Sequence, residues 1–425
     1  MLVELINTGS ELMLGRVLNT HQQWLCRRLA DLGYVVTRQV AVPDTAHDIE
    51  PAIRIALAHA DLVITTGGLG PTSDDLTREL IAQLLGKKSH RNDAVLAQIK
   101  NYFASRNRPT PERTAVEALV PEGAIVLPNP HGTAPGLAIE VKPNPFRTGQ
   151  KTSWLIMLPG PPRELRPMFD DFVVRILRRE FPLEAAFVCR TLRTGGMGES
   201  IVQEKIEAPL RALVAAGLEI GYCARIGQVD VRLSAQGANA QTTVDAAGKI
   251  VREQLGEHIF GTGDDLLEGV VVRLLTERKQ TLALAESCTG GCIAHRVTNV
   301  PGASAVFPGG FVTYSNETKQ KFLGVRAETL AQHGAVSEAV AREMAEGARK
   351  QTSADFAIAV TGIAGPTGGT PDKPVGTVFI ALASSRGTEV WKMLNPWERE
   401  TFKEVTAQQA LDRLRLMLQK LCKTP

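Results

Sequence analysis

A serine on a predicted strand-to-helix turn is the first residue that could do covalent chemistry. It lies in Glu286-Ser-Cys-Thr-Gly-Gly291, after an apolar strand predicted over 281–285. A hydroxyl at such a turn lies near backbone N–H groups that can stabilise an oxyanion. An unassisted serine is a weak nucleophile, so Ser287 needs a base. No histidine is close in the sequence, and a lysine would serve if burial lowered its pKa.

Two other interpretations of this turn stay open. Cys288 is a rival nucleophile, because a helix N-terminus lowers the pKa of a thiol. Ser287 taken alone also fits a helix N-cap, which is the more frequent role for serine at such a position. Cys288 and Cys292 have a spacing that could suit a metal, but no further ligand pair accompanies them, and small buried apolar side chains are the simpler interpretation.

A glycine-rich loop near the N-terminus has the composition of a phosphate-binding loop. Thr65-Thr-Gly-Gly-Leu-Gly-Pro-Thr-Ser-Asp-Asp75 follows a buried strand predicted over 62–64. Its glycines let the backbone approach a ligand, and the next helix offers free N–H groups. Asp74 and Asp75 could cap that helix or hold a divalent cation against a phosphate. A glycine turn with an N-cap aspartate is an equally frequent interpretation of such a segment.

Further polar loops are predicted at other strand ends. In the first half these are Gly9-Ser-Glu-Leu-Met-Leu-Gly15, Asp44 and His131-Gly-Thr-Ala-Pro-Gly136. In the second half they are Tyr314-Ser-Asn-Glu-Thr-Lys319 and Thr361-Gly-Ile-Ala-Gly-Pro-Thr-Gly-Gly369, with Arg399 at the start of the last helix. A phenol, an amine, a glycine loop and a guanidinium together could bind a phosphate or a sugar. A flexible surface loop and a surface arginine are the simpler alternatives.

Parallel sheets must position these loops. Short apolar strands alternate with amphipathic helices over the first third of the chain and again from Leu266, which favours an α/β fold with crossover helices. In such sheets ligands bind beyond the carboxyl ends of the strands. Residues 185–258 have the pattern of a small α+β unit. We therefore expect three domains, at residues 1–180, 185–258 and 264–425, in agreement with a length of 425 residues.

The composition excludes several classes of protein. Apolar residues make up 44% and charged residues 22%, which excludes disorder for most of the chain. The net charge of +3 comes without a basic run, so nucleic acid is not the expected partner. The six cysteines form no CxxC pair, which indicates reduced thiols. With no signal peptide and no apolar run of about 18 residues, we expect a cytoplasmic protein without membrane contact.

Nearly the whole chain resembles the CinA (competence/damage-inducible protein A) family. In the first domain the resemblance lies in Gly9–Gly15, Thr66–Thr77, Gly132–Gly136 and Leu158-Pro-Gly-Pro-Pro-Arg-Glu-Leu165. These segments look like the family's three-layer α/β/α domain, which is similar to the molybdopterin-binding MoaB/MogA fold. The middle block resembles a KH-like domain. The last domain resembles the α/β/α nicotinamide-nucleotide amidohydrolase PncC in Ala285–Gly291, Gly310–Asn316, His333–Ser337, Thr361–Pro366 and Lys373–Thr377.

This resemblance implies an activity and a role for each residue of the last domain. The activity would be hydrolysis of nicotinamide mononucleotide to nicotinic acid mononucleotide and ammonia, which recycles the pyridine nucleotide of NAD without a cofactor. Ser287 would be the nucleophile, Lys319 its base and Tyr314 an assistant. The remaining implied residues are Thr289 and Gly290 for the oxyanion, and Glu286, Thr361, Gly362 and Arg399 for the substrate. The chain departs from its relatives at Asn395-Pro-Trp-Glu-Arg399 and at Lys403, where a second arginine is expected.

For the first domain the resemblance implies metal-dependent hydrolysis of ADP-ribose to AMP and ribose 5-phosphate. The metal would be divalent, with or without potassium. The implied metal ligands are Asp44, Asp74 and Asp75, and the implied substrate-binding residues are Gly67, Gly68, Gly70 and Thr133. We expect a homodimer, as is frequent for large α/β chains.

Two other classes of function compete with these hydrolyses. The chain could be a non-catalytic protein that binds molybdopterin or takes part in competence or recombination. RNA binding through Gly195-Gly-Met-Gly198 is a further alternative, because this segment fits a GxxG loop, although its flanks are not notably basic.

Overall fold

The structure is a computed structural model that describes the backbone of residues 1–423 and the side chains as far as Leu421, so the side chain of Cys422 lies outside the described residues. The chain divides into two compact units, residues 1–188 and residues from 189 onward. Each unit is described by itself. No helix in the described part of the chain is long and apolar enough to cross a membrane.

The first unit is built on a six-stranded sheet of order β2-β1-β3-β8-β7-β6. The strands are β1 (Val3–Thr8), β2 (Val36–Val42), β3 (Leu62–Thr66), β6 (Ile125–Leu127), β7 (Gly136–Val141) and β8 (Ser153–Leu158). β2, β1, β3 and β8 are parallel, and β7 is antiparallel to both β8 and β6. The short strands β4 (Ser89–Arg91) and β5 (Leu119–Pro121) form a separate antiparallel pair.

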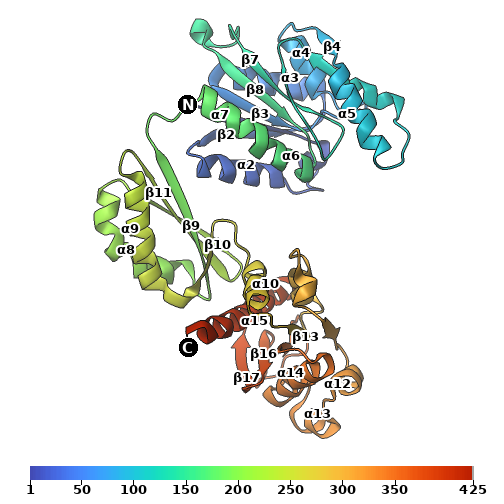
Figure 1. The fold of residues 1–425 in the computed structure, drawn as a ribbon, viewed down its shortest axis with the longest axis vertical. Helices are drawn as coiled ribbons and strands as arrows, with labels where there is room; N and C mark the ends of the chain where they lie inside the picture. Colours follow the sequence, from blue (N-terminus) through green and yellow to red (C-terminus); the bar gives the residue numbers. More distant parts are fainter. Residues whose placement is uncertain (424–425) are drawn as a thin grey trace. The chain divides into compact units, whose positions relative to one another are not determined.

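Helices cover both faces of this sheet, as the alternation predicts (Figure 1). The helices are α1 (Ser10–Met13), α2 (Thr20–Asp31), α3 (Ala46–His59), α4 (Thr77–Leu84), α5 (Asp93–Ala104), α6 (Pro162–Met168) and α7 (Val174–Glu180). Successive side chains of a strand point to opposite faces. Leu5 accordingly packs with Leu25 and Leu29 of α2, while Ile6 packs with Ile49 of α3. The result is the expected three-layer α/β/α domain.

Helix α4 differs from its prediction in the face that it buries. The leucine spacing predicts Leu76, Leu80 and Leu84 as the buried stripe, but these side chains are only half-buried. The buried side chains of α4 are those of Thr77, Arg78, Ile81 and Ala82. Arg78 can lie inside because its Nη1 donates to the carbonyl oxygen of Leu69 at 2.9 Å.

The second unit begins with a four-stranded sheet of order β10-β11-β9-β12. Its strands are β9 (Phe187–Gly195), β10 (Glu219–Arg225), β11 (Gln228–Gln236) and β12 (Ile259–Thr262), and its helices are α8 (Glu199–Ala215) and α9 (Ala240–Leu255). β12 pairs antiparallel with β9. This α+β block therefore extends to Thr262, beyond the predicted limit at residue 258. The Gly195-Gly-Met-Gly198 segment joins β9 to α8.

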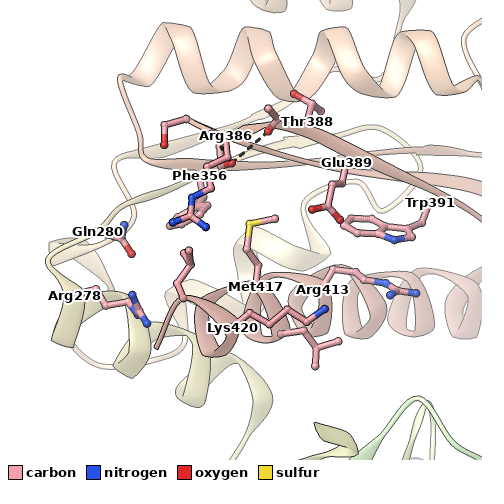
Figure 2. A pocket seen from close by; sticks show the side chains of 15 residues that line it. Arg278, Gln280, Phe356, Arg386, Thr388, Glu389, Trp391, Arg413, Met417 and Lys420 are labelled. Atoms are coloured by element: carbon pink, nitrogen blue, oxygen red, sulfur yellow. Dashed lines mark hydrogen bonds between the residues drawn. The ribbon is translucent and has the colours of Figure 1, made fainter. Parts of the chain in front are cut away.

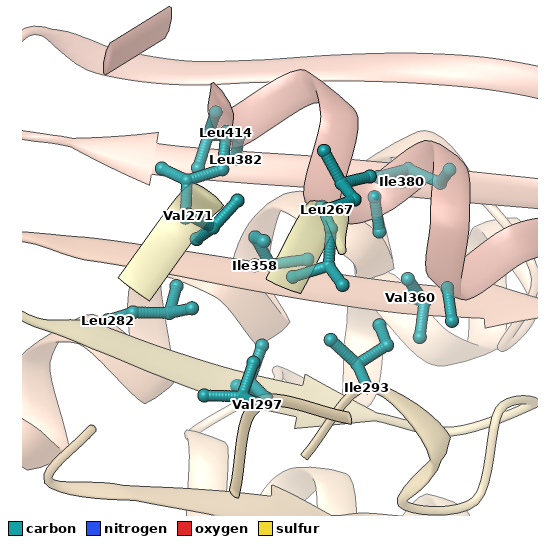
Figure 3. Close-up of a cluster of buried hydrophobic side chains, with 14 of the residues drawn as sticks. Leu267, Val271, Leu282, Ile293, Val297, Ile358, Val360, Ile380, Leu382 and Leu414 are labelled. Atoms are coloured by element: carbon teal, nitrogen blue, oxygen red, sulfur yellow. The ribbon is translucent and has the colours of Figure 1, made fainter. Parts of the chain in front are cut away.

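The last domain is an α/β/α sandwich on a five-stranded sheet of order β14-β13-β15-β16-β17. Its strands are β13 (Leu282–Glu286), β14 (Gly309–Val312), β15 (Phe356–Gly362), β16 (Thr377–Ser384) and β17 (Gly387–Leu394). Its helices are α10 (Leu267–Arg278), α11 (Cys292–Thr298), α12 (Asn316–Leu323), α13 (Ala327–His333), α14 (Glu338–Thr352) and α15 (Arg399–Lys423). Figure 3 shows the core on one face, where Leu282, Ile358 and Ile380 of the sheet meet Val271 and Leu414 of the helices.

Strand direction brings the predicted loops of this domain to one edge. β14, β13 and β15 are parallel, so Glu286, Val312 and Gly362 end their strands on the same side. β16 is antiparallel to β15, and β17 is antiparallel to β16. β17 ends and α15 begins at the same edge, which places Arg399 there as well.

The α+β block and the last domain are joined through α15. Arg415 is fully buried, and its Nη2 donates to the carbonyl oxygen of Glu257 at 2.8 Å. Its other guanidinium nitrogens donate to Asp412 at 2.7 Å and to Gln419 at 2.8 Å. A buried arginine with all its polar atoms engaged fixes the two parts against each other, because breaking it would leave an unpaired charge.

Candidate active site

A serine and a lysine from two different loops meet at the carboxyl edge of the last domain. Nζ of Lys319 donates to Oγ of Ser287 at 3.0 Å and to the carbonyl oxygen of Thr313 at 2.8 Å. The side chain of Lys319 is 1% exposed, and Ser287 is 9% exposed. Ser287 follows β13, while Lys319 lies in the first turn of α12, which Ser315 caps. The fold thus brings together two residues that are 32 positions apart.

Burial gives Lys319 the protonation behaviour that a base needs. Desolvation lowers the pKa of Lys319 below the usual value of 10.5. A neutral amine keeps a lone pair, which can accept the proton of the Ser287 hydroxyl across the same 3.0 Å contact. The Thr313 carbonyl oxygen orients the amine, because it accepts a hydrogen bond from one of the N–H groups of Lys319. The pair therefore has the geometry of a nucleophile with its general base.

Glu286 holds the turn that carries Ser287. Its Oε2 accepts hydrogen bonds from Oγ1 of Thr289 at 2.7 Å and from the backbone N–H groups of Gly291 and Ile293 at 3.0 and 3.1 Å. Its Oε1 accepts from the N–H of Ala294 at 2.8 Å. A carboxylate suits these donors because they begin a helix. Glu286 is buried, so the position predicted for substrate contact leaves almost no surface for a substrate and instead supports the turn.

The oxyanion donors predicted at this turn are only partly available. The hydroxyl of Thr289 is engaged by Glu286, and the N–H of Gly290 donates to the Ser287 carbonyl at 3.1 Å. Among the described residues, the backbone N–H groups of Cys288 and Thr289 have no main-chain acceptor. These two N–H groups follow the nucleophile directly, which is where an oxyanion needs its donors. Gly290 has a φ of 60°, which favours glycine at this point of the turn.

The environment of Cys288 does not favour the rival nucleophile. Its side chain is 5% exposed and packs in the apolar core beside Ile293. Burial raises the pKa of the Cys288 thiol to about 12. A thiol that keeps its proton is a poor nucleophile. Burial raises the pKa of the Cys292 thiol as well, so neither thiol is activated as a nucleophile.

Arg399 and Tyr314 form a polar rim on this edge. Nη2 of Arg399 donates to the Tyr314 hydroxyl at 2.5 Å, and Nη1 donates to the carbonyl oxygen of Gly365 at 3.0 Å. Tyr314 is 60% exposed. Lys403 lies one turn farther along α15, and a Cβ built on Gly290 would stand 3.9 Å from its Nζ. Lys403 therefore lies beside the Ser287 turn, at the position where an arginine is expected, while Arg399 is held by Tyr314 and Gly365.

Thr361 and Gly362 end β15 at the same edge but are taken up by the fold. Oγ1 of Thr361 donates to the carbonyl oxygen of Ala335 at 2.8 Å, and the residue is buried. A Cβ on Gly362 would approach the Thr377 carbonyl oxygen to 2.8 Å, so β16 leaves no room for a side chain there. Lys373 adds a second tie, since its Nζ donates to the His333 carbonyl at 2.9 Å. Any contact of these residues with a substrate would come through their backbone.

Thr313 is a site residue that the sequence analysis missed. Its carbonyl oxygen accepts a hydrogen bond from the Lys319 amine, and its N–H donates to the carbonyl oxygen of Glu286 at 2.9 Å. Its side chain is fully buried. Within the described residues its Oγ1 has no hydrogen-bond partner. Thr313 lies directly after β14, and nothing in its residue type indicated this role, because the contributing group is a backbone carbonyl.

The predicted loops of the first unit line one cavity of about 390 Å³. All seven residues predicted for substrate and metal lie on its wall: Asp44, Gly67, Gly68, Gly70, Asp74, Asp75 and Thr133. Gly68 has a φ of 67°, and a Cβ on it would collide with Thr77 at the start of α4. The absence of a side chain therefore brings the loop against the helix N-terminus, as a phosphate-binding loop requires.

The three predicted aspartates are not arranged as a closed metal cage. Asp75 accepts hydrogen bonds from the N–H of Thr72 at 3.0 Å and from its hydroxyl, and Asp44 accepts from the N–H of Ser10 at 2.7 Å. In the described part of the chain, no three His, Cys, Asp or Glu side chains lie together so that they could hold a metal ion. Mg²⁺ in nucleotide sites takes one or two carboxylates and completes its shell with phosphate and water. The aspartates fit a cation of that kind.

Two buried glutamates in this cavity escaped the sequence analysis. Glu117 is 1% exposed, and burial raises its pKa to about 7 even though the positive charge of Arg78 opposes the shift. Its Oε1 accepts from Oγ1 of Thr133 at 3.1 Å, while its Oε2 has no partner among the described residues. Burial also raises the pKa of Glu164, which accepts from Nδ2 of Asn129 at 2.8 Å. Neither lies in a motif that marks acid–base chemistry.

Comparison with known families agrees with this division of the chain. Residues 4–179 match the probable molybdopterin binding domain, residues 189–261 the damage-inducible protein CinA KH domain, and residues 264–418 the CinA C-terminal domain. A crystal structure of the competence/damage inducible protein CihA from Agrobacterium tumefaciens is 42% identical, covering 36% of this chain and 93% of that chain with a TM-score of 0.35.

Two relatives match over nearly their whole length. A putative competence-damage inducible protein of Caldicellulosiruptor saccharolyticus is 43% identical over 98% of this chain and 98% of its own. A CinA-like protein of Akkermansia muciniphila is 43% identical over 96% of this chain and 95% of its own. Because the relatives are matched over nearly their whole length and the three family models together cover most of this chain, the chain belongs to the CinA family.

Proposed function

We propose that the last domain hydrolyses the carboxamide of nicotinamide mononucleotide to nicotinic acid mononucleotide and ammonia. The observation that carries the proposal is the buried Lys319 amine, 3.0 Å from the Ser287 hydroxyl at the carboxyl ends of the parallel strands β13 and β14. A nucleophile and base of this kind suit acyl transfer. Arg399 and Lys403 at the rim suit the single phosphate of a mononucleotide.

The proposed reaction proceeds through an acyl-enzyme. Oγ of Ser287 attacks the carboxamide carbon while Nζ of Lys319 takes the hydroxyl proton. The N–H groups of Cys288 and Thr289 stabilise the oxyanion, and Lys319 returns the proton to the departing ammonia. Water then attacks the ester, again with Lys319 as base, which releases the acid and restores the Ser287 hydroxyl. All proton transfers are thus carried by one amine.

Ammonia release from nicotinamide mononucleotide, measured with a chelator present, tests this proposal. We expect the wild type and Cys288→Ala to turn over and Ser287→Ala to be inactive, because only the serine has a base in contact. If Cys288→Ala is inactive while Ser287→Ala retains activity, the nucleophile is wrongly assigned. If the well-folded wild type releases no ammonia, the proposed amidase function fails.

A second activity is favoured by the cavity of the first unit. We propose that the first unit, with a divalent cation bound, hydrolyses the pyrophosphate bond of ADP-ribose and releases AMP and ribose 5-phosphate. The cation would lie on Asp44, Asp74 or Asp75 and would neutralise charge on the pyrophosphate. The glycine loop would bind the phosphates through N–H groups. Both proposed substrates are fragments of NAD, which gives one chain a reason to carry both sites.

Asp75→Ala separates this activity from simple binding. We expect wild-type turnover of ADP-ribose only with added divalent cation, and loss of that turnover in Asp75→Ala with ammonia release unchanged. Retention of a bound pterin without turnover would favour the alternative of a non-catalytic binding protein in competence or recombination. We also propose a homodimer, which sedimentation of the full chain would test.

A further inference from the structure

A cavity of the last domain lies at the end of the sheet opposite Ser287. Its volume is about 700 Å³, and its wall comes from the start of β15, the hairpin between β16 and β17, and the last turns of α10 and α15. β15 runs from Phe356 at this cavity to Gly362 at the candidate active site. The two sites therefore share no residue and have different surroundings.

The wall of this cavity is strongly cationic. Arg278, Arg386, Arg413 and Lys420 line it, and Glu389 is the acidic residue among its lining residues. The whole chain holds 48 basic and 45 acidic residues, so a ratio of four to one is a local concentration of positive charge. Figure 2 shows Arg386 reaching into the cavity from the hairpin, while Arg278 and Arg413 reach it from the helices.

Two of these guanidinium groups are held in place by the protein. The Arg413 guanidinium carbon lies 4.9 Å from the centre of the Trp391 ring, a cation–π contact that limits its side-chain freedom. Nη2 of Arg278 donates to the Leu418 carbonyl oxygen at 2.7 Å. Groups placed in advance lose less entropy when a ligand binds, so the cavity is partly preorganised.

We propose that this cavity is a binding site for a small molecule that carries a diphosphate or triphosphate group. Planar guanidinium groups bind phosphate oxygens in pairs, and four cations against one carboxylate suit the several negative charges of a diphosphate or triphosphate better than the single charge of a carboxylate. The volume lies within the range of about 300–1,000 Å³ for small-molecule sites. Trp391 lies beside Arg413, so a nucleoside attached to the phosphates would meet an aromatic wall. The chemistry is shared by free pyrophosphate and by nucleotides.

Calorimetric titration of the full chain distinguishes these sources. The probes are pyrophosphate, ATP and adenosine, each at low and high salt. We expect pyrophosphate and ATP to bind, with affinity that falls as salt increases, and adenosine not to bind. Tighter binding of ATP than of pyrophosphate would identify a nucleotide site, and equal affinity would identify a polyphosphate site.

Variants assign the binding to this cavity rather than to either candidate active site. We expect Arg386→Ala and Arg413→Ala each to weaken binding at least tenfold and the double variant to lose one binding equivalent. Lys392→Ala is the matched control, because Lys392 neighbours Trp391 on β17 but is exposed on the other face. Thermal unfolding checks that each variant is folded. Unchanged affinity and stoichiometry in the double variant, no binding of either phosphate compound, or equal binding of adenosine would overturn the proposal.

Discussion

Replacement of Glu117 by glutamine should change how the stability of the first unit depends on pH. Burial raises the pKa of Glu117 to about 7, against 4.5 for an exposed glutamate. Between these pH values the unfolded chain releases the proton that the folded unit keeps. The wild-type unit therefore loses stability as the pH rises from 4.5 to about 7, and glutamine removes that loss.

The expected magnitude follows from the size of this pKa shift. At about 1.36 kcal/mol per pKa unit, the gap between the two states corresponds to roughly 3.4 kcal/mol. Any difference in unfolding free energy between glutamine and protonated glutamic acid is the same at every pH, so it does not contribute to the pH dependence. The stability difference between Glu117→Gln and the wild type should thus grow by about 3 kcal/mol between pH 4.5 and pH 8.5, in favour of the variant.

Tryptophan fluorescence can follow this unit in the full chain. Trp24 and Trp154 lie in the first unit, and replacing Trp391 and Trp397 by phenylalanine leaves only these two as reporters. Urea unfolding at each pH then gives the free energy of unfolding. Glu140→Gln, a substitution of an exposed glutamate in the same unit, is the control. A difference that stays within about 0.5 kcal/mol across the pH range would refute the buried, protonated state of Glu117.

Three further predictions concern the Ser287 turn. Lys319→Met should reduce ammonia release at least about 10²-fold, since it removes the base, while Lys321→Met on the exposed side of α12 should not. The wild-type rate should rise with pH and level off below pH 10.5, because the neutral amine of Lys319 is the active form and its pKa is lowered; a rate that is flat or falls over the alkaline range contradicts this role. Glu286→Gln should destabilise the second unit by at least about 3 kcal/mol, because an amide would face N–H donors, and exposed Glu328→Gln provides the comparison in thermal unfolding.

Residue type and periodicity predict much of this architecture. Asn19 and Ser337 are of the residue types that favour helix N-caps, and they cap α2 and α14. The strands β1, β3, β8, β13 and β15 coincide with short apolar runs of the sequence. Such signals are local, because a cap or a buried strand depends on a few neighbouring residues. They also place each polar loop at a strand end. The rule that parallel strands present their carboxyl ends together then predicts which loops share an edge.

Residue type and periodicity do not predict contacts between segments that are far apart in the sequence. Nothing in the spacing places Arg78 inside the first unit or joins Arg415 to Glu257, because both contacts depend on how helices pack. The same limit explains Thr313, whose contribution is a backbone carbonyl. It also explains Glu117, which lies in a 3-10 helix between α5 and β5 without any motif. Burial decides the chemistry of such a side chain, and burial is a property of the fold.

Burial shifts the pKa of one residue in each candidate site, and both shifts are toward neutral pH. It lowers the pKa of the Lys319 amine and raises that of the Glu117 carboxyl, because in both cases the charged form loses its solvation. The pKa of each group therefore lies closer to neutral pH than the pKa of an exposed lysine or glutamate. Each also keeps one interaction with a fixed partner, the Thr313 carbonyl or the Thr133 hydroxyl, which orients it. Burying an ionisable group costs folding free energy at both positions. A role in acid–base chemistry therefore explains these two residues better than a contribution to stability.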